Sequence, residues 1–316
     1  MSLRVGVWFF PAAPSATIVE AVVAAEQLGL DEVWLGDEGP SRDPFALLGA
    51  AAHATRRVRL GVAVTNPYLR HPATTAAAAM TIHELSGGRM VLGLGPGGDL
   101  ALAPAQIPRA RPLTATRDAL RIIRAVSRGY PTEGYTPMSH ALRAPDLPVF
   151  IGARGERFNR FASAEADGVF LGGIPRSRLT GTAGWARSIR QIELAVYPAA
   201  VFDADAREAL RPRLIYALVD APAVTREVLG VCRAPTVAAA AALAHGDVGP
   251  ACALIDDRVL DELLAYGTPP QVGRELAARV RSIRPRSLGI AMVAEDPMAM
   301  LEPAAEALAV AREELE

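Results

Sequence analysis

Short apolar runs alternate with longer segments of mixed polarity along most of the chain. The apolar runs show little polar–apolar alternation, which is typical of strands buried on both faces of a parallel sheet. The longer segments carry helix signals, such as the capping residue Ser15 before one of them and the helix-ending Gly29 after it. The predicted strands cover residues 3–10, 32–38, 58–64, 90–94, 149–151, 169–171, 192–197 and 287–293.

Helices predicted between these strands complete a repeating strand–helix order. Residues 204–265 are expected to be mainly helical, without a strong strand, and residues 129–148 to leave the main scaffold. This order predicts an α/β fold with a parallel sheet, either an eight-stranded (β/α)8 TIM-type barrel or a doubly wound sheet. The predicted helices cover residues 15–28, 44–54, 73–85, 114–127, 156–165, 178–189, 268–283 and 297–313.

Length and composition fit one large domain. The chain has 316 residues, somewhat more than a barrel of about 250, which leaves room for insertions near 129–148 and 204–265. Hydrophobic residues make up 51% and charged residues 21%, so the chain can bury a large core. Because no linker or low-complexity tract divides it, we expect a single domain over residues 1–316.

Charge and hydropathy narrow the range of partners. The net charge of -1 argues against nucleic-acid binding, which normally requires a basic surface. No apolar run approaches the roughly 20 residues needed to span a bilayer, and the start lacks the pattern of a signal peptide. We therefore expect a cytoplasmic protein without a membrane partner. Cys232 and Cys252 show neither metal-site spacing nor a disulfide framework.

Two of the predicted strands end in loops with unusual backbone requirements. The strand at 58–64 runs into Thr65-Asn66-Pro67, and the strand at 90–94 runs into Gly95-Pro96-Gly97-Gly98. Parallel strands joined by helices place such loops on one face of the sheet, and we expect the chemistry there.

The glycine-rich turns differ in how well they suit a phosphate group. Residues 93–98 formally fit a dinucleotide fingerprint, but Pro96 occupies the turn and no helix is predicted to open there. Gly152-Ala153-Arg154-Gly155 follows a strand and opens a helix, so its amides can bind an anion and Arg154 can add a charged contact. The alternative is an ordinary turn with a solvated arginine. Gly172-Gly173, after the next strand, favours the phosphate hypothesis.

Acidic residues and histidines give weaker signals. Asp37 and Glu38 end the second strand, either as a solvated loop or as a polar contact to a ring at the sheet edge. His71 precedes Pro72 and is expected to be structural. No Ser/His/Asp set, metal-ligand spacing or paired-carboxylate pattern is visible, so we predict no metal and expect a bound cofactor to carry the chemistry.

Three segments carry a recognisable pattern: Val64-Thr65-Asn66-Pro67-Tyr68-Leu69-Arg70-His71-Pro72, Glu84-Leu85-Ser86-Gly87-Gly88-Arg89 and Leu92-Gly93-Leu94-Gly95-Pro96-Gly97. They resemble the bacterial luciferase-like superfamily, and most of all its coenzyme F420-dependent methylenetetrahydromethanopterin reductases. The resemblance covers nearly the whole chain; it is dense from 33 to 98 and thin from 176 to 260.

The resemblance implies a TIM-type barrel with a deazaflavin ring at the carboxyl ends of the strands. It also implies a homodimer, a small-molecule substrate and a non-prolyl cis peptide between Ala63 and Val64, within a bulge. Asp37 and Glu38 become the candidate catalytic residues. The cofactor-binding residues that it implies are Asp37, Ala63, Val64, Thr65, Asn66, Gly95, Gly97, Gly98, Gly152, Ala153, Arg154, Gly155, Gly172 and Gly173.

Two departures from the family pattern keep alternatives open. Glu38 stands where the family usually has histidine, and residues 292–297 replace a glycine- and proline-containing end. We predict an F420-dependent oxidoreductase that transfers a hydride to or from C5 of the deazaflavin. The alternatives are an FMN-dependent monooxygenase of the same superfamily and a non-catalytic flavin- or F420-binding relative.

Overall fold

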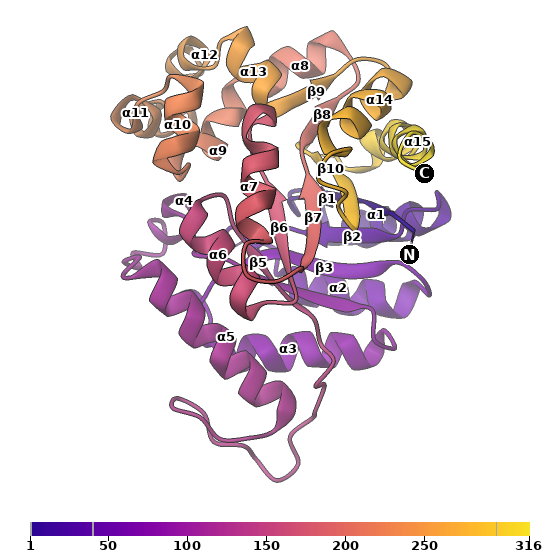
Figure 1. Ribbon diagram of the computed structural model, residues 1–316, viewed down its shortest axis with the longest axis vertical. Coiled ribbons are helices and arrows are strands. Elements are labelled where there is room, and N and C mark those ends of the chain that lie inside the picture. The colour runs from indigo at the N-terminus through magenta and orange to yellow at the C-terminus, as the bar shows by residue number, and fades with distance from the viewer. Residues whose placement is uncertain (1, 40, 295) are drawn as a thin grey trace.

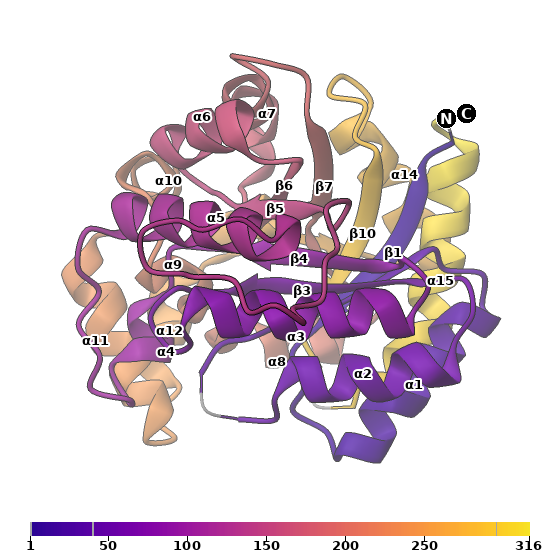
Figure 2. The same cartoon turned by 90° about the horizontal axis from the view of Figure 1, so that it is seen from below.

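A closed barrel of parallel strands forms the centre of the protein (Figures 1 and 2). The computed structural model describes residues 2–39, 41–294 and 296–316. Within these residues, eight strands follow one another around the barrel, and β1 closes it by pairing with the last strand, β10. The TIM-type fold is therefore confirmed and the doubly wound sheet excluded. The strands are β1 (Arg4–Phe9), β2 (Glu32–Leu35), β3 (Arg59–Thr65), β4 (Met90–Leu94), β5 (Val149–Gly152), β6 (Gly168–Gly172), β7 (Glu193–Tyr197) and β10 (Ser287–Met292).

Helices surround the barrel, and the two chain ends lie side by side on its outside (Figure 2). Apolar side chains of the strands and helices form one continuous layer between them. The helices are α1 (Ser15–Gln27), α2 (Pro44–Ala54), α3 (Pro72–Leu85), α5 (Pro112–Arg128), α6 (Glu156–Glu165), α7 (Leu179–Ala186), α14 (Pro269–Val280) and α15 (Met298–Glu313).

Some predicted helix limits were wrong. The helix predicted at 114–127 begins at Pro112, because proline suits the first helical position. The helix predicted at 178–189 consists of a 3₁₀ turn, η1 (Arg176–Arg178), and α7, which ends at Ala186. The amides of Ile189 and Arg190 leave the helix and bond to the hydroxyl of Ser163, on α6. His71 is structural as predicted, since its ring accepts a hydrogen bond from Ala73 N at the start of α3.

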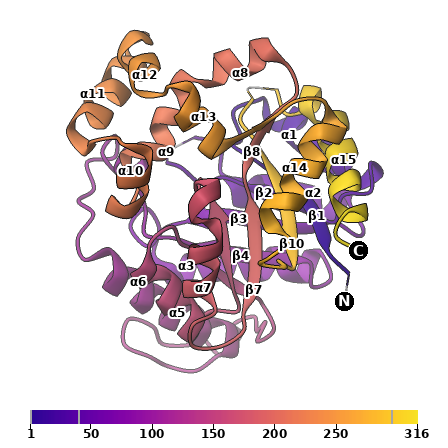
Figure 3. The ribbon, with the colours of Figure 1, turned by 45° about the horizontal axis from the view of Figure 1, so that its top comes forward.

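Residues 199–266, which we call the cap, lie beyond the carboxyl end of β7 and have a hydrophobic cluster of their own (Figures 1 and 3). The expectation of no strand in 204–265 was wrong at its end, because the cap closes with β9 (Leu264–Tyr266), which pairs with β8 (Ala199–Val201). Three residues are too few to show a strand pattern. The cap helices are α8 (Ala204–Leu210), η2 (Pro212–Leu214), α9 (Ile215–Val219), α10 (Ala223–Leu229), α11 (Arg233–Ala244), α12 (Gly249–Leu254) and α13 (Asp257–Leu263).

Large aromatic side chains fill the barrel interior. Trp34 lies at its centre, with ring centroids 5.8 Å from Phe150 and 5.2 Å from Phe170, and Phe170 stacks on Tyr197 at 4.9 Å. Glycines on neighbouring strands make room for these rings. A Cβ atom on Gly61 would lie 2.2 Å from Trp34 Cε3, which is closer than non-bonded atoms can approach.

A buried carboxylate lies below the rings, at the amino end of the barrel. Glu32 is fully buried, and its Oε2 accepts hydrogen bonds from Trp34 Nε1 at 3.0 Å, Tyr197 Oη at 3.1 Å and Ser287 Oγ at 2.7 Å. Its Oε1 pairs with Arg59 Nη1 at 2.7 Å and with Arg4. Burial disfavours the charged form, but the two guanidinium groups and Ser287 outweigh it and hold the pKa of Glu32 below its usual value.

We expect Gly61→Ala to destabilise the barrel by about 1–3 kcal/mol, because the added methyl group overpacks the contact with Trp34. Gly49→Ala is the matched control. Gly49 lies within α2, and a Cβ there would meet no atom within 4 Å, so this change should stabilise the protein by about 0.5–1 kcal/mol. Urea unfolding of both variants measures the difference. Equal stabilities would show that the barrel interior accommodates a methyl group next to Trp34.

Candidate functional site

The predicted site residues all lie at one end of the barrel, which we call the mouth. They occupy the carboxyl ends of β2 to β6 or the loops that follow these strands. Because neighbouring barrel strands are parallel, the fold brings the five segments together. Asp37 and Glu38 follow β2; Ala63, Val64 and Thr65 end β3 and Asn66 follows it; Gly95, Gly97 and Gly98 follow β4; Gly152 ends β5 and Ala153, Arg154 and Gly155 follow it; Gly172 ends β6 and Gly173 follows it.

The end of β3 has the irregular backbone that the resemblance implies. The peptide bond between Ala63 and Val64 is cis, and the pairing of β3 with β4 shifts register between Val62 and Thr65. Trp8 of β1 donates a hydrogen bond from its indole nitrogen to the Ala63 carbonyl at 2.6 Å. Both features that were predicted here, the cis bond and the bulge, are confirmed.

Val64 accounts for two of the predicted cofactor-binding glycines. A Cβ atom on Gly95 would lie 2.4 Å from Val64 Cγ2, and one on Gly152 would lie 2.9 Å from Val64 Cγ1. The ends of β4 and β5 therefore require glycine for packing against Val64, whatever else binds there. This packing holds three strand ends together beneath the mouth.

The turn after β3 is shaped by its own side chains. Asn66 is 2% exposed, and its Oδ1 accepts hydrogen bonds from Tyr68 N at 3.0 Å and Leu69 N at 3.1 Å. This is a local turn-forming role that asparagine commonly performs. Thr65, which is also buried, hydrogen bonds through its side chain with the carboxyl group of Asp37.

The two acidic residues after β2 have pKa values above their usual range. The Glu38 side chain is exposed, but the protein atoms around it partly desolvate the carboxyl group and raise its pKa, while the charge of Arg154 opposes the shift and that of Asp37 adds to it. Burial likewise raises the pKa of Asp37, against the hydrogen bond with Thr65. Both groups therefore hold a proton to a higher pH than the same carboxyl groups would in an unfolded chain.

Arg154 connects the barrel to the cap. Its guanidinium group is half-buried and donates a hydrogen bond to the carbonyl of Ala217, in α9. Burial lowers the pKa of Arg154, and the charges of Asp220 and Glu38 oppose the shift. A Cβ on Gly173 would lie 3.8 Å from Arg154 Nη1, so the turns after β5 and β6 share this arginine. The alternative of a fully solvated Arg154 is therefore wrong.

Asp220, in the cap, is a site residue that the sequence did not reveal. Its side chain is 11% exposed; Oδ2 accepts a hydrogen bond from Asp99 N at 2.8 Å, and Oδ1 lies 3.0 Å from Arg109 Nη1. Arg109 also donates to the Gly97 carbonyl at 2.9 Å. Asp99 and Asp220 are 121 positions apart, so no local motif joins them.

The loop after β4 contains a short helix that the sequence did not predict, and Asp220 lies against it. The loop was expected to lack helix before residue 114, but it contains α4 (Asp99–Leu102), whose first amide bonds to Asp220. A Cβ on Gly98 would lie 2.7 Å from Asp220 Oδ2, so a carboxylate already faces this turn. The turn is therefore a poor anion site, whereas Gly152–Gly155 lies beside the positive charge of Arg154.

Comparisons with known proteins agree with this geometry. The model of the family described as luciferase-like monooxygenase matches residues 4–286. The chain belongs to this family. A 5,10-methylenetetrahydromethanopterin reductase of Methanolobus tindarius is 29% identical over 282 residues, which cover 84% of this chain and 86% of that protein.

Solved structures of F420-dependent enzymes share the luciferase-like fold of this chain. The coenzyme F420-dependent tetrahydromethanopterin reductase from Methanopyrus kandleri superposes with a TM-score of 0.79 at 23% identity, over 96% of this chain and 98% of that one. An F420-dependent secondary alcohol dehydrogenase, solved with an F420–acetone adduct, gives a TM-score of 0.75 at 17% identity, over 98% of this chain and 99% of that one.

The described residues contain no group of three His, Cys, Asp or Glu side chains placed to hold a metal ion. Among the described residues, no single helix is long and apolar enough to cross a membrane. The consecutive helices α10 and α11 reach that length and apolar character only together, and the chain bends by 85° between them.

We expect Asp220→Ala to loosen the cap at the mouth, because it removes the acceptor of Asp99 N and the partner of Arg109. The cost should be about 1–3 kcal/mol, as for other hydrogen bonds to a charged group. Hydrogen exchange of the α4 amides should become faster, as mass spectrometry can measure. Asp205→Ala is the matched control, an exposed cap aspartate at the start of α8, and it should change little. Unchanged exchange in Asp220→Ala would show that α4 is held by other contacts.

Proposed function

We propose that this luciferase-like oxidoreductase uses coenzyme F420 to transfer a hydride to or from a small organic substrate. The observation that carries the proposal is the mouth itself, where a glycine turn with Arg154 and the carboxyl group of Glu38, whose pKa is raised, lie above an apolar barrel interior. The 5,10-methylenetetrahydromethanopterin reductases that match 84–85% of this chain, and the coenzyme F420-dependent tetrahydromethanopterin reductase with the same fold, support the choice of cofactor. Because the family is described as luciferase-like monooxygenase, FMN is the second candidate for the cofactor.

The residues at the mouth suit a ring with a phosphate-bearing tail. Ala63 and Val64 would lie under the ring, together with Thr65 and Asn66. The turns Gly152–Gly155 and Gly172–Gly173 would hold the phosphate. A Cβ on Gly155 would lie 3.4 Å from Pro222, and a Cβ on Gly173 would lie 3.8 Å from Arg154. Side chains at these two positions would therefore fill the space in which we place the phosphate. Arg154 bonds through one nitrogen to Ala217, which leaves further N–H groups for an anion.

The chain contributes proton transfer and positioning. Coenzyme F420, when bound, supplies a hydride at C5 of its deazaflavin ring. A carbonyl or imine carbon that accepts a hydride also needs a proton on its heteroatom, and Glu38 is the residue that we propose to supply it. Asp37, hydrogen bonded to Thr65, carries a neighbouring negative charge that favours the protonated form of Glu38. The cap, through Asp220 and Arg154, limits the access of water to the side of the mouth near β4 and β5.

We expect the purified protein to bind F420 more tightly than FMN. Fluorescence-quench titrations with each cofactor measure both dissociation constants under the same conditions. Tight FMN binding without F420 binding would contradict the proposal and favour the monooxygenase. Binding of F420 without its reoxidation by any of a broad panel of carbonyl, imine and pterin substrates would favour the non-catalytic relative.

Arg154→Ala should weaken F420 binding by about 1–3 kcal/mol, the range for a hydrogen bond to a charged group. The matched control is Arg157→Ala, since Arg157 is an exposed arginine three residues further along the chain, on α6, the helix that follows the turn. The same titration measures both. If the two variants bind F420 equally well, the turn holds the cofactor by its backbone amides alone or does not hold it.

Glu38→Gln should lower the rate of substrate reduction by about 10²–10⁴-fold, as expected when a general acid is lost. The pKa of Glu38 is raised, so its acid form persists to a higher pH and the wild-type rate should fall as the pH rises through that pKa. This dependence should disappear in Glu38→Gln. Glu156→Gln, at an exposed position on α6, is the control. A pH profile that is the same in Glu38→Gln and wild type would exclude Glu38 as the acid.

A further inference from the structure

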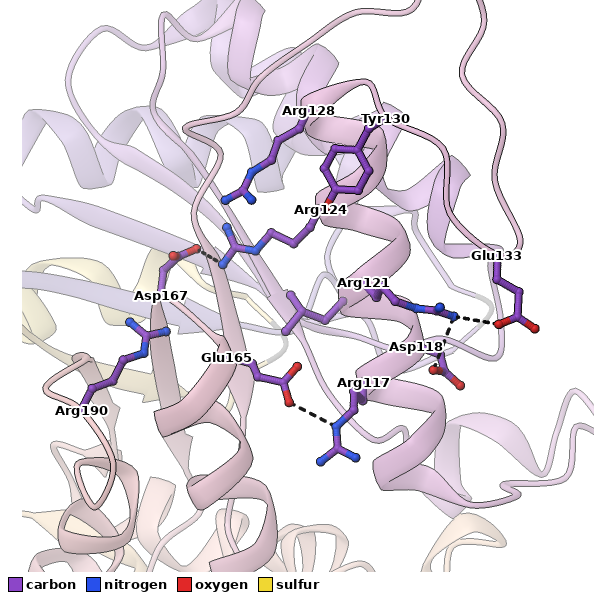
Figure 4. A pocket seen from close by; sticks show the side chains of 11 residues that line it. Arg117, Asp118, Arg121, Arg124, Arg128, Tyr130, Glu133, Glu165, Asp167 and Arg190 are labelled. Atoms are coloured by element: carbon purple, nitrogen blue, oxygen red, sulfur yellow. Dashed lines mark hydrogen bonds and ion pairs between the residues drawn. The ribbon is translucent and has the colours of Figure 1, made fainter.

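A groove lined by arginines lies outside the barrel, between α5 and the end of α6 (Figure 4). Its volume is about 720 Å³, within the range of pockets for small molecules. One wall is α5, on which four arginines recur at spacings of four, three and four residues and therefore share one face. They are Arg117, Arg121, Arg124 and Arg128. Arg190 faces them from the segment before β7.

Ion pairs account for the arginines at the outer end of the groove. Arg117 lies 3.2 Å from Glu165, and both side chains are about half exposed. Arg121 lies 3.7 Å from Asp118 and 3.6 Å from Glu133. Such exposed pairs stabilise a protein by about 0–1 kcal/mol, and they leave no guanidinium group without a partner. The outer end of the groove therefore gives no reason to expect a ligand there.

The inner end has more positive than negative charge. Arg124, Arg128 and Arg190 line this end together with Asp167 (Figure 4). Asp167 Oδ2 accepts a hydrogen bond from Arg124 Nη2 at 2.8 Å, and it also accepts one from Val149 N at 2.8 Å. Three arginines and one aspartate line the inner end, which leaves two positive charges in excess.

Arg128 and Tyr130 are the groups at this end that the fold does not use. Within residues 2–39, 41–294 and 296–316, Arg128 has no hydrogen-bond or ion-pair partner, while Arg190 donates to the carbonyls of Ala164 and Ala166. Tyr130 lines the groove next to Arg128 and is 41% exposed. A guanidinium fork and a phenol group are thus available to a ligand.

We propose that the inner end of the groove binds a phosphate group, at a site separate from the mouth. A phosphate carries a charge of about -1.5 to -2 at pH 7, which matches the two excess positive charges. The planar guanidinium of Arg128 can donate two parallel hydrogen bonds to it, while Arg124 and Arg190 add positive charge at the same end and the hydroxyl of Tyr130 can serve as a further donor. The phosphate is either free in solution or part of a small molecule such as a nucleotide.

Calorimetric titration with inorganic phosphate and with ADP, at constant ionic strength, tests the site. Wild type should bind at least one of them; tighter binding of ADP identifies a phosphorylated small molecule, and equal or tighter binding of inorganic phosphate identifies the free ion. Arg128→Gln should weaken the binding at least tenfold, and Tyr130→Phe should weaken it to a smaller extent. Arg274→Gln, at an exposed arginine of α14 outside the groove, should have no effect.

The same titration on Arg154→Ala separates this site from the mouth. Because Arg154 lies at the mouth, its loss should leave phosphate binding in the groove unchanged, whether or not the protein binds F420. The proposal is overturned if wild type binds neither ligand at millimolar concentrations, or if Arg128→Gln binds as wild type does. It is also overturned if Arg154→Ala abolishes the binding, because the ligand would then occupy the mouth.

Discussion

The contact between aromatic rings and glycine backbone inside the barrel is the constraint on which the rest depends. Trp34, Phe150, Phe170 and Tyr197 fill the space because Cα atoms without side chains face them from the neighbouring strands. This filling makes the barrel a packed core rather than a channel. It also leaves Ala63 and Val64 as the upper layer, where Trp8 holds the Ala63 carbonyl and Val64 packs against the glycines of β4 and β5. Because the interior is packed below this layer, we expect a ligand of the barrel to bind at the mouth.

Charge then distinguishes the turns around that mouth. The turn after β4 faces the carboxylate of Asp220, and the turns after β5 and β6 share the guanidinium of Arg154. Both of these side chains connect the barrel with the cap, through Asp99 N and the Ala217 carbonyl. Residues of the cap thus place a negative charge beside one glycine-rich turn and hold the arginine beside the other two. On the proposed function, this difference in charge decides which turn suits an anion.

The sequence predicted the features that depend on local pattern. Buried parallel strands, helix caps and strand-ending glycines each have a signature within a few residues, and these gave the parallel α/β arrangement and the position of the mouth. The choice of a barrel over a doubly wound sheet came from the resemblance. The cis bond at Ala63 was predicted from the resemblance alone. Asp220 and Arg109 could not be found, because their partners lie far away in the sequence. The strand β9 was missed because it is only three residues long. The structure alone reveals that Gly95 and Gly152 must be glycines because Val64 packs against them.

A crystal structure of the protein with F420 tests the central claim most directly. The account predicts electron density for the deazaflavin ring over Ala63 and Val64, and for the cofactor phosphate within hydrogen-bond distance of Arg154 and the amides of Gly152–Gly155. It also predicts Glu38 facing the reactive side of the ring. Density for the phosphate at the turn Gly97–Gly98, or for the cofactor in the groove beside Arg128 with the mouth free, would contradict the account.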